Sequence, residues 1–385
     1  MWFGQLGISS ALWTEQVARN WLTYQLTGSA LQLGLVNLMR ALPVMALGLW
    51  GGVLTDRLDR RMFFLIIQGW SFLVYVLMGW VVLSGNLALW HLYASSFALS
   101  LGMAMDGPLR TSTIPSVVAP ERLINALSLN GLAINGTRLF LPAGVGVMLG
   151  IANPGWAYLG LAGVYLLIQV FTLQLHLPDT RSAERSSSML GDMREGFAFV
   201  RKDRTIRALL MAAVGVQGIG FSHRALVPVF VGATLGMGSG AYGLLLSADG
   251  LGAVLFGLGM ASFGIPRRRG LYMIAVSAAN AVAILVLGFA AWLPLAMLVV
   301  MVSGGSSTAF RSSNNSLLLG ETPVELRGRV MSFNGLNQGI APMLMVVWGA
   351  LADLTSVTVA LVTLGLLALL VQATVHAFEP RIRRL

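Results

Sequence analysis

The chain has 385 residues, of which 56% are hydrophobic and only 10% are charged. Soluble domains carry roughly one quarter charged residues, so this composition argues against a soluble protein. The formal net charge of +10 would suit nucleic acid, but the positions of the basic residues, described below, exclude that partner. Cysteine is absent and the four histidines are scattered, which excludes disulfides and disfavours a metal site.

Repeated apolar runs fill the chain almost from end to end. Each is about 20 residues long, enough for a helix to cross the hydrocarbon core of a bilayer. One such run can be a buried core helix, but twelve in series predict an all-α membrane protein with twelve transmembrane helices. The predicted spans are 3–26, 32–55, 62–84, 88–112, 123–150, 155–177, 205–233, 240–263, 270–290, 293–317, 327–352 and 356–378.

Basic residues mark one side of the predicted membrane. All but four of them lie in or beside alternate loops and in the C-terminal tail, whereas the short intervening loops carry none. The four exceptions, Arg19, Arg40, Arg138 and Arg224, lie within predicted helices. Because Lys and Arg favour the cytoplasmic side, this pattern predicts a multi-pass protein of the bacterial inner membrane with both termini in the cytoplasm. Residues 1–26 lack a signal-peptide cleavage site and are interpreted as a retained first helix. The basicity thus reflects topology and contact with membrane lipids, not nucleic acid.

The chain divides into two halves joined by a polar linker. The predicted domains are a six-helix bundle at 1–177, a cytoplasmic linker at 178–204 and a second six-helix bundle at 205–385. Residues 121–132 recur in similar form at 325–336, about half the chain later, as expected for a repeat of two parallel halves.

Apolar residues recur at helical spacing within the linker, between charged ones. The pattern predicts a short amphipathic helix on the cytoplasmic membrane surface, with a disordered tether as the alternative. The apolar positions are Leu190, Met193, Phe197 and Val200.

A short charged loop at 51–61 separates the second and third predicted helices. Its arginines cannot enter hydrocarbon cheaply, so they indicate a tight cytoplasmic turn. The loop resembles the signature loop of the major facilitator superfamily, roughly Gly-x-Leu-Ala-Asp-Arg-x-Gly-Arg-Arg. The matching residues are Gly52, Leu54, Asp56, Arg57, Arg60 and Arg61. The resemblance implies two six-helix bundles around a central substrate site, usually in a monomer. It also implies that Asp106, near Arg110 on the fourth helix, pairs with Arg60 in a gating network.

The fifth predicted helix carries Pro142, Gly144 and Gly146 in a pattern similar to the Gly-Pro-x-x-Gly-Gly motif of drug/proton antiporters. Pro and Gly at these positions would bend the helix and let neighbouring helices approach closely. Residues 21–29 and 40–43 resemble the bacterial exporter branch that contains the enterobactin exporter. The resemblance therefore implies export of a small molecule.

Ionisable residues within membrane helices are candidate functional groups, because an unpaired charge is costly in hydrocarbon. Glu15 and Arg19 lie four residues apart on one face of the first helix. Glu15 is a candidate for proton coupling; alternatively, the two residues form a permanent ion pair that makes the helix tolerable in lipid. Arg138 on the fifth helix is a candidate for attracting an anionic substrate, or else a counter-ion of Glu15.

Asp249 on the eighth helix occupies roughly the place that Arg40 has on the second helix of the other half. These two residues are candidates for an ion pair that closes the outer side and breaks on protonation; alternatively, Asp249 pairs with Arg224 or His223 on the seventh helix. The unperturbed pKa of histidine near neutrality suits proton coupling, although a lone His on a membrane helix also serves in packing. The predicted coupling residues are Glu15, Asp249 and His223, and the predicted cavity residues are Arg19, Arg40, Arg138 and Arg224.

No Walker loop, His-Glu-x-x-His or Gly-x-Ser-x-Gly motif occurs, so neither ATP hydrolysis nor hydrolase chemistry has a carrier. We therefore expect a secondary transporter rather than a membrane-embedded enzyme. Its energy source would be the proton gradient, without a cofactor, and its cargo a small amphipathic or anionic molecule such as a drug or siderophore. A lipid or lysolipid flippase and a proton-symport importer are alternatives on the same fold.

Overall fold

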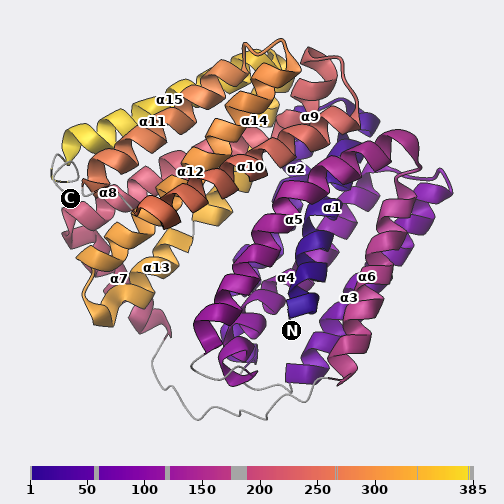
Figure 1. Ribbon diagram of the computed structural model, residues 1–385, viewed down its shortest axis with the longest axis horizontal. Helices are drawn as coiled ribbons and strands as arrows, with labels where there is room; N and C mark the ends of the chain where they lie inside the picture. The colour runs from indigo at the N-terminus through magenta and orange to yellow at the C-terminus, as the bar shows by residue number, and fades with distance from the viewer. Residues whose placement is uncertain are drawn as a thin grey trace. The chain divides into compact units, whose positions relative to one another are not determined.

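The structure, a computed structural model, describes residues 2–55, 60–117, 122–174, 189–264, 266, 268–335, 337–379 and 381. Every regular element within those ranges is a helix, which confirms the predicted all-α fold class (Figure 1). Backbone contacts divide the chain into two compact units. The first unit contains Met1–Ala183 and Met237–Ser247, and the second contains Glu184–Gly236 and Ala248–Leu385.

The helices of the first unit follow the predicted spans closely. They are α1 (Trp2–Thr27), α2 (Ala30–Thr55), α3 (Arg60–Leu83), α4 (Leu89–Val117), α5 (Leu123–Ile151) and α6 (Gly155–Gln174). Helix α1 packs on α5, α2 on α4, and α3 on α6. The connections α1–α2 and α3–α4 are tight turns in which Gly28 and Gly85 have positive φ angles of 62° and 74°. Glycine adopts this conformation without the steric cost that a Cβ would impose.

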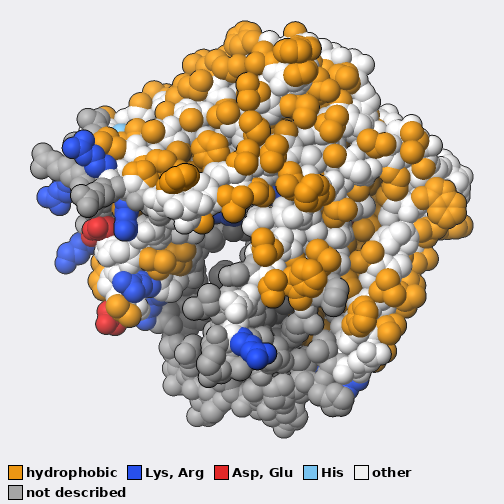
Figure 2. Space-filling model, in the orientation of Figure 1, with side chains coloured by type: hydrophobic (Ala, Val, Ile, Leu, Met, Phe, Trp, Pro, Cys, Tyr) orange, Lys and Arg blue, Asp and Glu red, His pale blue; other side chains and the backbone are white. Residues whose placement is uncertain are grey.

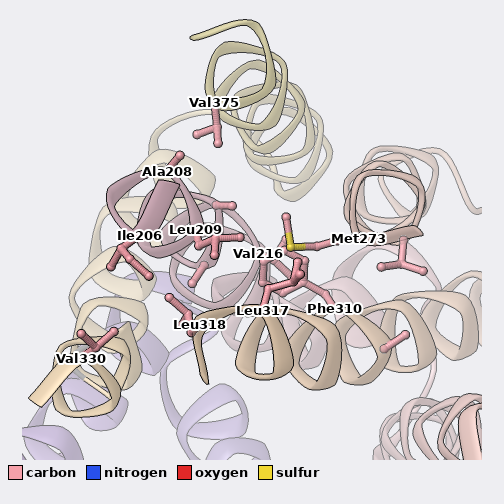
Figure 3. Packing of buried hydrophobic residues seen from close by; sticks show 14 residues of the cluster. Ile206, Ala208, Leu209, Val216, Met273, Phe310, Leu317, Leu318, Val330 and Val375 are labelled. Carbon is pink, nitrogen blue, oxygen red and sulfur yellow. The ribbon is translucent and has the colours of Figure 1, made fainter. Parts of the chain in front are cut away.

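The second unit is built around a buried apolar cluster that joins several helices (Figure 3). Its helices are α7 (Met189–Lys202), α8 (Arg204–Ala213), most of α10 (Ser239–Phe263), α11 (Arg269–Leu287), α12 (Leu293–Glu321), α13 (Arg327–Gly335), α14 (Asn337–Leu354) and α15 (Val357–Phe378). Figure 3 shows Leu209 of α8, Phe310 of α12 and Met273 of α11 directed toward one another, all of them fully buried. Helix α11 also packs along both α12 and α15, so it lies between these two helices.

Helix α10 contributes to both units. Its residues up to Ser247 group with the first unit, and its residues from Ala248 onward group with the second. The sequence pattern marks 240–263 as a single span of the second half and gives no sign of this division.

The seventh predicted span, 205–233, contains a helical stretch long enough to cross a membrane, but its hydrogen bonding is not α-helical throughout. After α8 the chain forms wide helical turns at Val214–Ile219, tighter 3₁₀ turns at Gly220–Ala225, a short α9 at Val227–Val229 and wide turns again at Phe230–Thr234. Gly215, Gly218 and Gly220 are poor helix formers, and Pro228 has no N–H to donate. We call residues 204–234 the broken span; such interruptions of α-helical hydrogen bonding are frequent at functional sites.

Ten helical stretches in the described part of the chain are long and apolar enough to cross a membrane. These correspond to ten of the twelve predicted spans, with 327–352 divided between α13 and α14. Helices α1 and α4 are not among the ten, although they have 26 and 29 residues. Polar residues lower the mean hydropathy of both helices. In α1 these include Gln5, Gln16 and Asn20 as well as Glu15 and Arg19, and in α4 they include His91 and several serines as well as Asp106.

Hydrophobic side chains are spread widely over the described surface visible in Figure 2. Ile151, Phe263 and Leu354 are 83%, 92% and 84% exposed, as expected of helices that face lipid rather than water. Exposed basic side chains gather around the junction of α7 and α8, where Arg201, Lys202, Arg204 and Arg207 follow closely in the chain.

Candidate functional site

The first unit contains a buried ion pair at the predicted positions Glu15 and Arg19. Both lie on α1, and their spacing of four residues places them on one face of the helix. The Nε of Arg19 donates a hydrogen bond to Oε1 of Glu15 at 2.7 Å, and the two side chains are 1% and 2% exposed. Burial this complete requires that each charge be paired.

Arg40 on α2 gives Glu15 a second counter-ion. Its Nη1 donates to Oε2 of Glu15, so that each carboxylate oxygen holds one guanidinium. Its Nη2 lies 3.1 Å from the thioether sulfur of Met103 on α4. The Arg40 side chain is 18% exposed, more than either of its partners. One carboxylate therefore faces two guanidiniums, and we call Glu15, Arg19 and Arg40 the shared-carboxylate cluster.

Three residues extend this cluster by hydrogen bonds. Both terminal nitrogens of Arg19 donate to Oδ1 of Asn37 at 3.3 Å. The Asn37 amide donates to Oδ1 of Asn20, whose own amide donates to the hydroxyl of Tyr242 on α10, each at 3.3 Å. Asn37 and Tyr242 are not among the site residues predicted from the sequence. The sequence did hold one signal for Asn37: it is a polar amide side chain within an apolar run, one turn before Arg40.

Buried tyrosines on α3 and α6 lie within electrostatic range of Glu15 and the two arginines. The ring of Tyr75 lies 5.3 Å from that of Tyr165 and 6.5 Å from that of Tyr158. All three tyrosines are buried, and electrostatic interactions in such a low-dielectric interior are stronger than in water.

Arg138 lies on α5, with its guanidinium carbon 5.8 Å from the centre of the Trp13 ring. This distance is within the range of a cation–π contact. The carboxylate oxygens of Glu15 bind Arg19 and Arg40. The structure thus places Arg138 against the ring of Trp13, which precedes Glu15 by two residues on α1.

The second unit contains a buried ion pair between the broken span and α10. The Nη2 of Arg224 donates to Oδ2 of Asp249 at 2.7 Å, and the side chains are 8% and 4% exposed. The Arg224 guanidinium also lies 3.9 Å from the centre of the Phe221 ring. This arrangement matches the alternative in which Asp249 pairs with the seventh predicted span.

His223 is buried beside this pair, in the 3₁₀ turns of the broken span. Its Nδ1 lies 2.5 Å from the carbonyl oxygen of Gly220, so Nδ1 is the nitrogen that carries a proton. The backbone carbonyl of His223 also accepts a hydrogen bond from the backbone N–H of Leu226. Both the side chain and the backbone of His223 therefore stabilise the turn between Gly220 and Leu226.

Glycines let α12 lie directly against the backbone of α10 at Asp249. A Cβ at position 304 would collide with the Asp249 carbonyl oxygen and lie 2.8 Å from its Oδ1. A Cβ at position 252 would collide with the carbonyl oxygen of Met301. Close backbone approach of this kind is typical of small residues in membrane helices, and it fixes the position of Asp249 relative to α12.

The helix 5 motif makes a similar contact within the first unit. A Cβ on Gly146 would lie 2.5 Å from the Ser239 carbonyl oxygen and 2.8 Å from the Cα of Gly243. The backbone N–H of Ala143, next to Pro142, donates to Oγ of Ser247 at 2.9 Å. Gly144, by contrast, has open space where a Cβ would lie.

The predicted gating loop falls largely outside the described part of the chain. Asp56 and Arg57 lie outside the described residues, and Gly52, Arg60 and Arg110 are described only as helix backbone. Arg61, at the start of α3, donates from Nη2 to the carbonyl oxygen of Leu173 at the end of α6. Asp106 is half-buried on α4. The pairing of Asp106 with Arg60 stays a prediction.

The two ion clusters define what the described residues can do chemically. Each places a carboxylate, which can gain or lose a proton, against arginines, which stay charged. No group of three His, Asp or Glu among the described residues is arranged to hold a metal ion. Side chains of these kinds are suited to proton uptake and to ionic binding.

Comparison with known proteins identifies the family. The family model for "Transmembrane secretion effector" matches residues 1–383. The chain is 24% identical over 246 residues to the staphyloferrin A transporter of Staphylococcus aureus (strain NCTC 8325 / PS 47), covering 63% of this chain and 61% of that relative, less than two thirds of its length. It is 25% identical over 344 residues to the enterobactin exporter of Citrobacter koseri, covering 86% of this chain and 76% of the relative. It is 26% identical over 382 residues to the multidrug efflux pump Tap of Mycolicibacterium fortuitum, covering 96% and 92%.

Solved structures share the fold at lower identity. A D-xylose–proton symporter has a TM-score of 0.74 at 15% identity, with 96% of this chain and 95% of the symporter covered. The nucleoside transporter NupG has a TM-score of 0.70 at 16% identity, with 98% of each chain covered. These likenesses confirm the predicted fold, and the matches to exporters confirm the predicted relationship. The chain belongs to the transmembrane secretion effector family of the major facilitator superfamily, whose members named above are membrane transporters.

Proposed function

We propose that this transporter couples the proton gradient across the bacterial inner membrane to export of a small amphipathic or anionic compound, such as a drug or a siderophore. The observation that carries this proposal is the shared-carboxylate cluster of Glu15, Arg19 and Arg40 among apolar helices. Buried charges are costly in a membrane and are typically retained for work on a substrate, a proton or a gate. A carboxylate between two arginines changes the charge of such a site by one unit when it takes up a proton.

The relatives support the direction and the class of cargo. By their names, two handle siderophores and one exports drugs. At identities of 24% to 26% they support a class of compound rather than one compound. The lack of a nucleotide-binding motif in this sequence leaves an ion gradient as the energy source we propose, with no cofactor.

Transport would follow alternating access, in which the two bundles expose a central site first to one side and then to the other. We propose Glu15, Asp249 and His223 as the coupling residues, and Arg19, Arg40, Arg138 and Arg224 as residues of the substrate site. A ligand or proton shifts a conformational equilibrium only by its difference in affinity for the two states. Paired buried charges provide that difference, because their solvation changes when the site opens. We propose a monomer with both termini in the cytoplasm.

Flux through proteoliposomes under an imposed pH gradient tests this function. The panel contains a lipophilic cation, a siderophore-like anion and a headgroup-labelled lysolipid, with wild type compared with Glu15→Gln and Asp249→Asn. Glu325→Gln is the matched control, because Glu325 is exposed in a turn between α12 and α13. We expect gradient-dependent flux in wild type and the control, and its loss in at least one coupling variant. Flux that ignores the gradient and survives in both variants would contradict proton coupling, and flux of lysolipid alone would indicate a flippase.

The shared-carboxylate cluster also favours a second candidate, proton symport into the cell. Protonation of Glu15 would free two arginines for an anion, so proton and anion would bind best together. Two sets of proteoliposomes under the same inward proton gradient distinguish the two directions of transport. Vesicles free of cargo report uptake, and vesicles loaded with cargo report release. Accumulation inside the vesicles would indicate symport, and accelerated release would indicate antiport.

A further inference from the structure

We propose that Arg19 and Arg40 form a binding subsite for the carboxylate of an organic anion, and that Glu15 occupies this subsite when no substrate is bound. Uptake of a proton by Glu15 releases the two guanidiniums, and the substrate carboxylate takes its place. This inference rests on the second candidate function above, proton symport of a small anion, because proton and anion bind together, and it specifies the group by which that anion is held.

The charges of the cluster supply the first argument. One carboxylate faces two guanidiniums, so these three side chains carry one positive charge in excess. The other hydrogen-bond acceptors of the arginines are uncharged. Arg19 has the amide oxygen of Asn37, and Arg40 has the thioether of Met103. A thioether is a weak acceptor, so Arg40 keeps unused capacity to bind an anion.

The geometry of Glu15 supplies the second argument. Its Oε1 accepts from Arg19 and its Oε2 accepts from Arg40, so the two oxygens of one planar group join two helices. A group that replaces Glu15 without moving either arginine needs two oxygens at the same spacing. Another carboxylate meets this condition, and its hydrogen bonds from the two guanidiniums would be charge-assisted and therefore strong.

Exposure supplies the third argument. Glu15 and Arg19 are 2% and 1% exposed, whereas Arg40 is 18% exposed. Arg40 is therefore the member of the cluster that an incoming anion meets first. The substrate would bind Arg40 and then reach Arg19 as Glu15 withdraws.

Glu15 is the group whose charge controls this exchange. The ionisable groups that face it or its partners are Arg19 on α1, Arg40 on α2, Tyr75 on α3, and Tyr158 and Tyr165 on α6. Arg138 on α5 stands over Trp13, and Asp106 on α4 follows one turn after Met103. Arginine and tyrosine keep their charge states around neutral pH. Among the described side chains of α1 to α6, the carboxylates are Glu15 and Asp106.

Binding of 1-pyrenebutyrate, an amphipathic carboxylate, to the purified full chain in detergent tests the subsite. The probe 1-pyrenebutyramide has the same shape without the charge and controls for partition into the apolar interior. We expect wild type to bind the carboxylate more tightly than the amide. Glu15→Gln removes the internal competitor, so we expect its affinity for the carboxylate to rise about tenfold while its affinity for the amide stays unchanged. Arg40→Gln is expected to abolish the preference for the carboxylate.

The pH dependence of wild type gives a second measurement that needs no variant to fold. We expect carboxylate affinity to increase several-fold from about pH 8 to about pH 6, where a larger fraction of Glu15 is protonated. The increase should persist in Asp106→Asn and vanish in Glu15→Gln. Weaker carboxylate binding by Glu15→Gln, or equal binding of carboxylate and amide by wild type, would overturn the subsite.

The binding assay is independent of the flux assay. Gradient-driven flux with no carboxylate preference would reject the subsite and leave the proposed function in place. A carboxylate preference of the expected kind without gradient-driven flux would support the subsite and reject proton-coupled transport.

Discussion

Gly304 on α12 lies directly against the backbone of Asp249 on α10. A methyl group at position 304 would collide with the Asp249 carbonyl oxygen and approach its Oδ1 to 2.8 Å. Because both sides of this contact include backbone, neither can turn away. We expect Gly304→Ala to separate the helices, disturb the ion pair with Arg224 and destabilise the protein by about 2 kcal/mol or more.

Thermal unfolding in detergent measures this effect, with Gly257→Ala on α10 as the matched control. A methyl group at position 257 would have no heavy atom within 4 Å, so alanine there should stabilise the helix by about 0.5–1 kcal/mol. Equal unfolding temperatures for the two variants would show that the contact at Gly304 is not tight.

The all-α membrane fold could be predicted from the sequence because long apolar runs have few alternatives in a bilayer. Glu15 and Arg19 could also be paired from sequence, since both lie on one helix. Arg40 could not be assigned to Glu15, because that contact joins residues 25 positions apart on different helices. The sequence offered Asp249 as a partner for Arg40, whereas the structure pairs Arg40 with Glu15 and Asp249 with Arg224.

The broken span shows the limit of apolar periodicity. Residues 205–233 are uniformly apolar enough to predict one helix, and the pattern carries no information about backbone hydrogen bonding. The glycines at 215, 218 and 220 were visible but are common in membrane helices. Only the packed structure shows that wide and 3₁₀ turns replace the α-helix there.

Asn37 tests whether the excess positive charge of the cluster matters. Its amide oxygen accepts from both terminal nitrogens of Arg19. Asn37→Asp would supply the missing negative charge, so we expect carboxylate binding to weaken about tenfold while amide binding is unchanged. The measurement is titration with the same pair of pyrene probes.

Asn37→Ala is the control for this substitution. It removes the same hydrogen bonds but leaves the excess charge in place, so it should retain the preference for the carboxylate. If both variants lose the preference for the carboxylate to the same extent, the hydrogen bonds of Asn37 matter for binding and the net charge of the cluster does not.

Asp203 caps the first turn of α8. Its Oδ1 accepts from the backbone N–H of Ile206 at 2.9 Å, which satisfies a donor that the helix itself leaves open. We expect Asp203→Ala to destabilise the protein by about 1 kcal/mol and Asp203→Asn to have little effect, because asparagine keeps the acceptor. Thermal unfolding of the two variants side by side is the measurement, and a larger loss from Asn than from Ala would be inconsistent with capping.

Helix α7 is attached to α13 by an ion pair and an aromatic contact. Glu195 and Arg329 are joined at 2.7 Å but are 64% and 26% exposed, whereas the rings of Phe197 and Phe333 lie 6.3 Å apart. Water and salt screen exposed pairs, so we expect Glu195→Gln to weaken the attachment by less than about 1 kcal/mol. Phe333→Leu should weaken it more, because it removes the ring contact.

Hydrogen exchange of residues 189–202 measures this attachment. We expect the effect of Glu195→Gln to disappear in about 1 M salt and that of Phe333→Leu to remain. Faster exchange in Glu195→Gln than in Phe333→Leu at high salt would contradict this ranking.

The sharing of α10 between the two units has a consequence for how the protein is made. The ribosome completes α1 to α6 long before it reaches residues 237–247, which group with the same unit. Until then the amide of Asn20 lacks the Tyr242 hydroxyl, and the face of α5 at Gly146 lacks its neighbour. Roughly two thirds of the chain must be synthesised before the first unit has all its packing partners. A nascent chain arrested after α6 therefore leaves the Asn20 amide without this hydrogen bond and the face of α5 at Gly146 without its packing partner.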